Sequence, residues 1–145
     1  MESNDATHDL CGSAGLHAVG RTIVRWNMDG RPGWPTYARL QLTVTGTDIT
    51  GTITLGDVHF GREGAVEAVT KMTQDARATP IFDVALHDGV LSFARRDEVE
   101  IDRFEMRAVN GEGQLTLLLR SADRAELASQ GIAVLQPISL KRTAQ

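Results

Sequence analysis

The residues best suited to chemistry lie in one charged stretch, RRDEVEIDRFEMR, at positions 95 to 107. Side-chain alternation fails there, because the apolar residues change phase between Ile101 and Phe104. One extra residue at Asp102-Arg103 would reverse the alternation of a strand. We therefore predict a β-bulge at this point.

A bulge would turn a neighbouring charge toward the apolar side of a sheet. An inward arginine could anchor a carboxylate or polarise a carbonyl, and an inward carboxylate could transfer a proton. Arg103 and Glu105 are therefore candidate catalytic residues. The alternative is a solvated outer face whose cross-strand ion pairs each contribute little.

His59, in the segment GDVHFGRE, is the third candidate catalytic residue. It lies between two apolar residues near a change of element, so it could act as a general base or as a hydrogen-bond donor to a ligand. The alternative is an ordinary surface histidine. The four histidines and the one cysteine, Cys11, show no spacing typical of a metal site, so none is expected.

Both tryptophans and the only tyrosine fall within residues 25 to 42. Pro32 and Pro35 flank Trp34 and restrict its poses, because proline fixes its own φ and limits the residue before it. Trp34 could therefore cover the mouth of a ligand cavity. The alternative is that Trp26 belongs to the core and Trp34 is a fixed plug.

Most of the chain alternates between apolar and polar residues with a period of two, which is typical of strands with one buried face. Turn signals separate the runs; Asp88-Gly89 is a preferred two-residue hairpin turn. Strands are predicted at residues 22–28, 37–45, 49–55, 82–86, 90–96, 101–109, 114–120 and 133–142.

Three local signals modify this pattern. Val66, Val69 and Met72 have helical spacing and predict a helix of about 12 to 14 residues within 62–80. Residues 121–131 predict a second, short helix that ends at a glycine. Pro137, inside the last predicted strand, indicates an edge or a bend.

These elements predict an all-β fold, an antiparallel up-and-down barrel of about eight strands with one or two short helices. A closed barrel is preferred over a sandwich because closure removes exposed edges. Residues 1–17 are predicted to be a flexible N-terminal arm, and residues 18–145 a single barrel domain.

The segments LQLTVTGTDITGTITL, FDVALHDGVLSF, FEMRAVNGEGQLTLLL and ISLKR together resemble the calycin-like barrels, which include lipocalin-like, fatty-acid-binding and avidin-like proteins. The resemblance covers residues 20–142. The Gly-x-Trp mark of lipocalins is missing, because Gly20 and Trp26 are six residues apart, so no functional residue is carried over. The resemblance implies a cavity for an apolar small molecule, or a relative in which that cavity is an active site.

The expected function is a cytoplasmic barrel that binds an apolar ligand in its interior. The alternative is a cofactor-independent cyclase, isomerase or lyase of specialised metabolism, and a third hypothesis is an interaction module or homodimer. The predicted ligand-binding residues are Trp26, Trp34, Tyr37, Leu40, Leu42, Phe93, Phe104 and Met106.

The composition of the chain limits which classes of binding partner are expected. The net charge of −4 argues against non-specific nucleic-acid binding, which needs a basic surface. No apolar run approaches the roughly 20 residues of a membrane helix, so no membrane partner is expected. Nucleotide-binding glycine motifs are missing, so no cofactor is expected. One cysteine and no signal-peptide pattern favour a cytoplasmic location.

Overall fold

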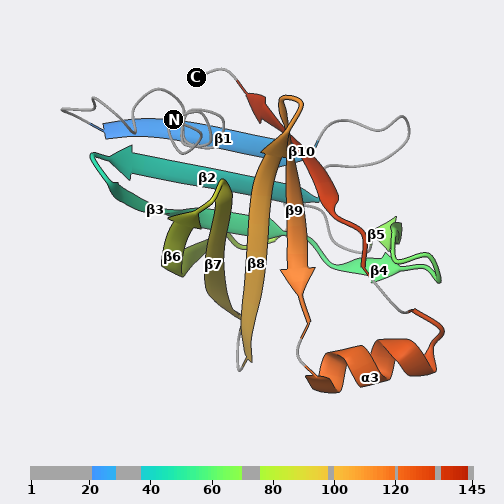
Figure 1. The fold of residues 1–145 in the computed structure, drawn as a ribbon. Coiled ribbons are helices and arrows are strands. Elements are labelled where there is room, and N and C mark those ends of the chain that lie inside the picture. Colours follow the sequence, from blue (N-terminus) through green and yellow to red (C-terminus); the bar gives the residue numbers. More distant parts are fainter. Residues whose placement is uncertain are drawn as a thin grey trace.

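Eight antiparallel strands close into a barrel in the order β1-β10-β9-β8-β7-β6-β3-β2, as the computed structural model shows (Figure 1). The structure describes residues 21–28, 37–69, 76–97, 100–119, 121–132 and 135–143. The barrel strands are β1 (Arg21–Met28), β2 (Ala38–Thr45), β3 (Asp48–Leu55), β6 (Thr79–His87), β7 (Val90–Asp97), β8 (Glu100–Val109), β9 (Glu112–Leu118) and β10 (Ile138–Thr143). The predicted fold class is confirmed.

Two-residue turns join several of these strands, as the sequence predicts. Asp88 and Gly89 have φ values of 51° and 77°, and Asn110 and Gly111 have values of 53° and 82°. Positive φ at both central residues is the conformation whose twist matches that of the flanking strands. The Asp-Gly turn between β6 and β7 is therefore confirmed.

The helix predicted within 62–80 is wrong in its described part. Val66–Val69 is a strand, β5, which pairs with β4 (Val58–Phe60) in a separate two-stranded sheet. Gly64, with φ at 79°, and the bond from the Gly61 amide to the Ala65 carbonyl close the hairpin. The β-branched valines fit both spacings, and pairing with β4 decides between them. Residues 70–75 lie outside the described part.

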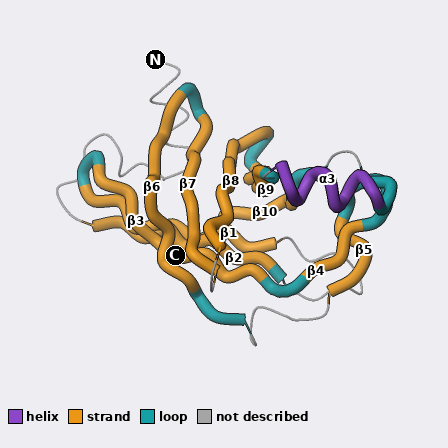
Figure 2. Tube along the Cα trace, turned by 90° about the horizontal axis from the view of Figure 1, so that it is seen from below, coloured by secondary structure: helices purple, strands orange, loops and turns teal. Residues whose placement is uncertain are grey.

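The second predicted helix is confirmed as α3 (Ser121–Ser129). It stops where expected, because Gly131 has φ at 86° and its amide bonds to the Ala128 carbonyl at 3.0 Å. Both views place α3 beside the β4–β5 hairpin (Figures 1 and 2). Gln136 ties the chain after the helix to that hairpin, through bonds of 2.8 Å to the carbonyls of Glu63 and Gly64.

The predicted bulge at Asp102-Arg103 is wrong, because β8 pairs without interruption with both β7 and β9. The register shift lies instead in β6, between Phe82 and Ala85, where Asp83 has φ at 52°. Ile81, Val84 and Leu86 therefore face the core, whereas Phe82 is out of phase with Val84 and Leu86. In β8 the alternation simply continues and turns Asp102 inward.

The last strand also differs from its prediction. It begins at Ile138, after Pro137, rather than running through that proline. It pairs with β1 on one side and β9 on the other, so it is not an edge. Since proline cannot donate to a strand ladder, a strand paired on both sides starts beyond it.

The middle of the barrel is filled by side chains. Trp26 is 1% exposed and packs over Gly113 of β9, where a Cβ atom would lie 2.9 Å from its Cε3. The buried residues around it are Val24, Leu40, Leu42, Ile53, Leu91, Phe93, Phe104, Met106, Leu115 and Leu140. A barrel of about eight strands either fills in this way or leaves room for one small ligand.

Candidate functional site

A cavity of 1030 Å³ opens at the rim of one end of the barrel, where β3 ends, β6 begins and β7 ends. Its lining residues are Leu55, Asp57, Ala76, Arg77, Ala78, Thr79, Pro80, Phe82, Arg95 and Arg96. The size is at the upper limit of small-molecule sites. The barrel therefore combines a packed middle with an open pocket at one rim, lined by residues from both faces of the strands.

Arg95 and Asp102 are two charged residues that lie on the same strand faces as the buried Phe93 and Phe104. They are register partners on β7 and β8, one step beyond the paired Phe93 and Phe104 on the same face. Arg95 Nε donates a hydrogen bond to Asp102 Oδ2 at 3.2 Å, and the side chains are only 14% and 22% exposed. A charge-assisted bond of this kind holds the guanidinium in one orientation.

The Arg95 guanidinium lies on the boundary between the core and the cavity. Its central carbon is 5.7 Å from the ring centroid of Phe104, which stacks on Phe93 with centroids 5.4 Å apart. This is within the range of a cation–π contact. The aromatic pair therefore contacts Arg95 from the core, and Arg95 also lines the cavity.

The bond to Asp102 leaves the two terminal nitrogens of Arg95, Nη1 and Nη2, for other acceptors, and Arg95 is a residue of the cavity lining. Within the described part of the chain, the only hydrogen bond of this side chain is the one from Nε. No buried side-chain nitrogen or oxygen of the described residues lacks a partner, so Nη1 and Nη2 must be accessible. Together they offer four N–H donors in one plane.

The lining is positively charged although the chain is acidic. Among the described residues, three arginines and one aspartate line the cavity, in a protein whose net charge is −4. Arg77 and Arg96 are exposed at the rim, and Arg95 lies deeper. Low-dielectric walls that carry one sign of charge focus the field and attract the opposite charge.

The ligand-binding residues predicted from the sequence come together in the core and not in the cavity lining. All of those described are buried: Trp26, Tyr37, Leu40, Leu42, Phe93, Phe104 and Met106. They fill the middle of the barrel, because side chains from facing strands interdigitate there. Trp34 and its proline-flanked loop lie outside the described residues.

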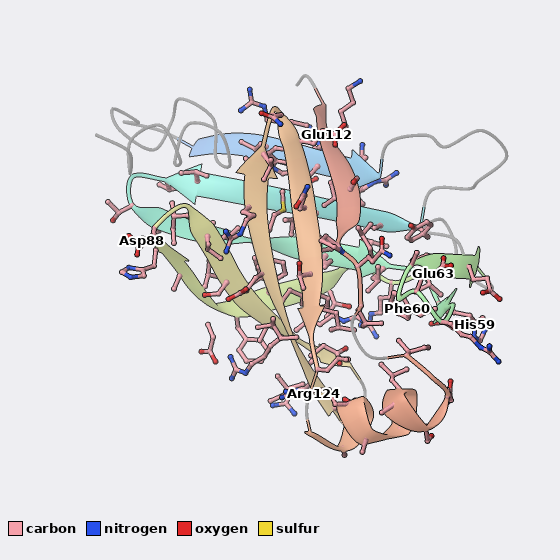
Figure 3. The ribbon with its side chains drawn as sticks, turned by 45° about the vertical axis from the view of Figure 1, so that its right-hand side comes forward. His59, Phe60, Glu63, Asp88, Glu112 and Arg124 are labelled. Carbon is pink, nitrogen blue, oxygen red and sulfur yellow. The ribbon has the colours of Figure 1, made fainter. Side chains whose placement is uncertain are left out.

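The three predicted catalytic residues are not brought together. Arg103 and Glu105 alternate with Phe104 and Met106, so they project to the outside. Arg103 Nη2 donates to Asp83 Oδ2 at 3.3 Å, and both side chains are more than half exposed. His59 is exposed on the β4–β5 hairpin, away from the barrel (Figure 3).

Arg95 and Asp102 were missed as site residues, although the sequence carries a signal for them. Arg95 follows Phe93 by two positions, and Asp102 precedes Phe104 by two. Uninterrupted alternation would have placed both on the apolar face. The predicted bulge concealed this signal, because it moved the expected inward charge to Arg103 and Glu105.

Another hollow, of 680 Å³, lies between the β4–β5 turn and the end of α3.

Within the described residues, no group of three or more histidine, cysteine, aspartate or glutamate side chains is arranged to hold a metal ion. The part of the chain that the structure describes also contains no helix long and apolar enough to span a membrane.

Comparison with known proteins gives no identification. No protein-family model, curated protein or solved structure matches this chain.

Proposed function

We propose that this protein is a calycin-like barrel that binds a small molecule in the cavity at its end. The observation that carries the proposal is the 1030 Å³ cavity, whose lining combines apolar side chains with a few charged groups. Ligand sites in proteins typically have this mixed character. The resemblance of the strand and turn pattern to calycin-like barrels supports the same function.

The ligand site is assigned to the barrel end because the middle is occupied. Trp26, Leu40 and Met106 are at most 1% exposed, so a ligand there would have to displace well-packed core residues. Such displacement is costly, since protein interiors are packed like organic crystals. Leu55, Phe82 and Thr79 instead line space that is already open.

The contacts of Arg95 favour a binding role over a catalytic one. Arg95 is paired with Asp102 and supported by Phe104, an arrangement suited to holding a ligand in place. A cyclase, isomerase or lyase would need a catalytic group at the ligand. His59, Arg103 and Glu105, the residues predicted for that role, do not line the cavity.

Blocking the cavity tests this proposal. Thr79 pairs with the inward-facing Ile53 and lines the cavity, so Thr79→Trp places an indole in the open space. We expect wild-type protein to bind the neutral fluorophore N-phenyl-1-naphthylamine saturably. Thr79→Trp should weaken this binding by about tenfold or more, roughly 1.4 kcal/mol.

Thr45→Trp is the matched control. Thr45 is exposed on the outer face of β2, beside the β2–β3 turn, and does not line the cavity. Its substitution should leave the dissociation constant of the fluorophore unchanged. The absence of saturable binding to wild-type protein, or equal binding by the Thr79→Trp variant, would contradict the proposal.

A further inference from the structure

The deepest charged group of the end cavity has unused hydrogen-bonding capacity. Arg95 Nε is bound to Asp102, whereas Nη1 and Nη2 are accessible and make no hydrogen bond within the described part of the protein. We propose that the ligand is an amphiphile with an oxyanion head, such as a carboxylate or sulfonate, and that Arg95 binds this head. This inference rests on the proposed function, since it names the ligand class of the same cavity.

The geometry of the ion pair suits an oxyanion. Asp102 accepts from Nε at 3.2 Å and thereby fixes the plane of the guanidinium. The edge formed by Nη1 and Nη2 then remains for a second acceptor, and two parallel N–H donors match the spacing of two oxygens in a carboxylate or sulfonate. Asp102 thus acts as a positioning residue, and Arg95 is the residue that contacts the ligand.

The charge of the surroundings favours an anion. Asp102 offsets one positive charge, and Asp57 lies among the lining residues, but Arg77 and Arg96 lie there as well. Among the described lining residues, the three arginines outnumber Asp57, and counting Asp102 as well leaves an excess of one positive charge, 3 − 2 = +1. The chain as a whole carries −4, so the preference for an anion is a property of this site.

The cavity lining also provides an apolar surface for the rest of the ligand. Leu55, Pro80 and Phe82 line the cavity together with Ala76 and Ala78. Removing apolar area from water favours binding. An oxyanion head at Arg95 with an apolar body against these side chains uses both parts of the lining.

Two fluorophores with the same ring skeleton separate this inference from the proposed function. One is N-phenyl-1-naphthylamine, which is neutral, and the other is 8-anilinonaphthalene-1-sulfonate, which adds only a sulfonate. Titration of wild-type protein should show about tenfold or greater preference for the sulfonate. Arg95→Gln should abolish that preference, so that the variant binds the two fluorophores with equal affinity.

Arg39→Gln is the matched control, because Arg39 is exposed on the outer face of β2 and its Nε donates to a side-chain oxygen, Asn27 Oδ1, at 3.1 Å. It should keep the wild-type preference. Arg95→Lys covers the case in which Arg95→Gln fails to fold: lysine keeps the charge but loses the paired donors, so the preference should fall to an intermediate value.

Each outcome distinguishes the two proposals. Equal affinity of wild-type protein for the two fluorophores, or a preference that survives Arg95→Gln, would overturn the oxyanion inference and leave the cavity as a binding site. Binding of neither fluorophore would overturn both proposals.

Discussion

Arg95 and Asp102 show how the alternation of side chains along a strand decides whether a charged residue faces the interior of a barrel. Each lies two residues from a buried phenylalanine, so each takes the inward face of its strand. The neighbouring pair Arg103–Asp83 joins β8 to β6 at a similar distance, 3.3 Å, yet lies on the outer face and is more than half exposed. Exposed pairs contribute little to stability. The two pairs therefore differ mainly in their surroundings.

Gly113 is the residue whose identity the core most clearly requires. A Cβ atom at this position would meet Met106 Cε and would lie 2.9 and 3.0 Å from Cε3 and Cζ3 of Trp26. Met106 can change rotamer, but the indole is enclosed. We expect Gly113→Ala to lower the free energy of unfolding by about 1–3 kcal/mol, because small-to-large changes in a packed core force side chains apart.

Urea unfolding followed by circular dichroism measures this effect. Gln114→Ala, at the next position of β9 and on the other face, should change stability by no more than about 0.5 kcal/mol. Equal stability of the Gly113→Ala variant and wild-type protein would show that Trp26 does not pack against β9 in this way.

At the scale of elements, local patterns predict strands well where their partners agree with them. The hairpin turns and α3 follow from short-range signals such as Asp88-Gly89 and Gly131. The helix expected within 62–80 failed because valines at positions 66 and 69 fit either element, and a distant partner, β4, decides. The bulge predicted at Asp102-Arg103 is wrong, and the register shift of β6 was not predicted, because its position depends on the register with β7.

The ladder between β3 and β6 has the fewest paired residues of any pair of neighbouring strands in the barrel. β3 pairs with β2 along eight residues, from Ala38↔Leu55 to Thr45↔Asp48, but with β6 only at Thr52 and Ile53. Backbone groups of Asp48–Gly51 that point away from β2 therefore lack a strand partner among the described residues. Amide hydrogens without a strand partner exchange with solvent through small local openings.

Amide hydrogen exchange followed by NMR tests this weak contact. Within Asp48–Gly51, amides directed toward β6 should exchange about tenfold faster than those bonded to β2. This ratio corresponds to a difference of about 1.4 kcal/mol in the free energy of protection. The amides of Leu40 to Val44, in a strand paired on both sides, are the control. Equal protection along both edges of β3 would contradict the described register.

At the scale of the whole molecule, closure of the sheet explains why fold and site differ in predictability. Alternation identifies the residues that face inward, and the predicted all-β barrel is confirmed. It does not identify the layer along the barrel axis in which each residue lies. Leu40 and Met106 share the inward face with Arg95, but the stagger of the strands puts them in the filled middle and Arg95 at the hollow end.

NMR mapping of bound N-phenyl-1-naphthylamine tests the central claim, that the end cavity is the ligand site, most directly. The largest shift changes in labelled wild-type protein should fall on Leu55, Thr79 and Phe82, which line the cavity. Val44, which is buried beside the β2–β3 turn, should be unaffected. Changes centred on the β4–β5 hairpin and α3, or the absence of saturable changes, would contradict the account.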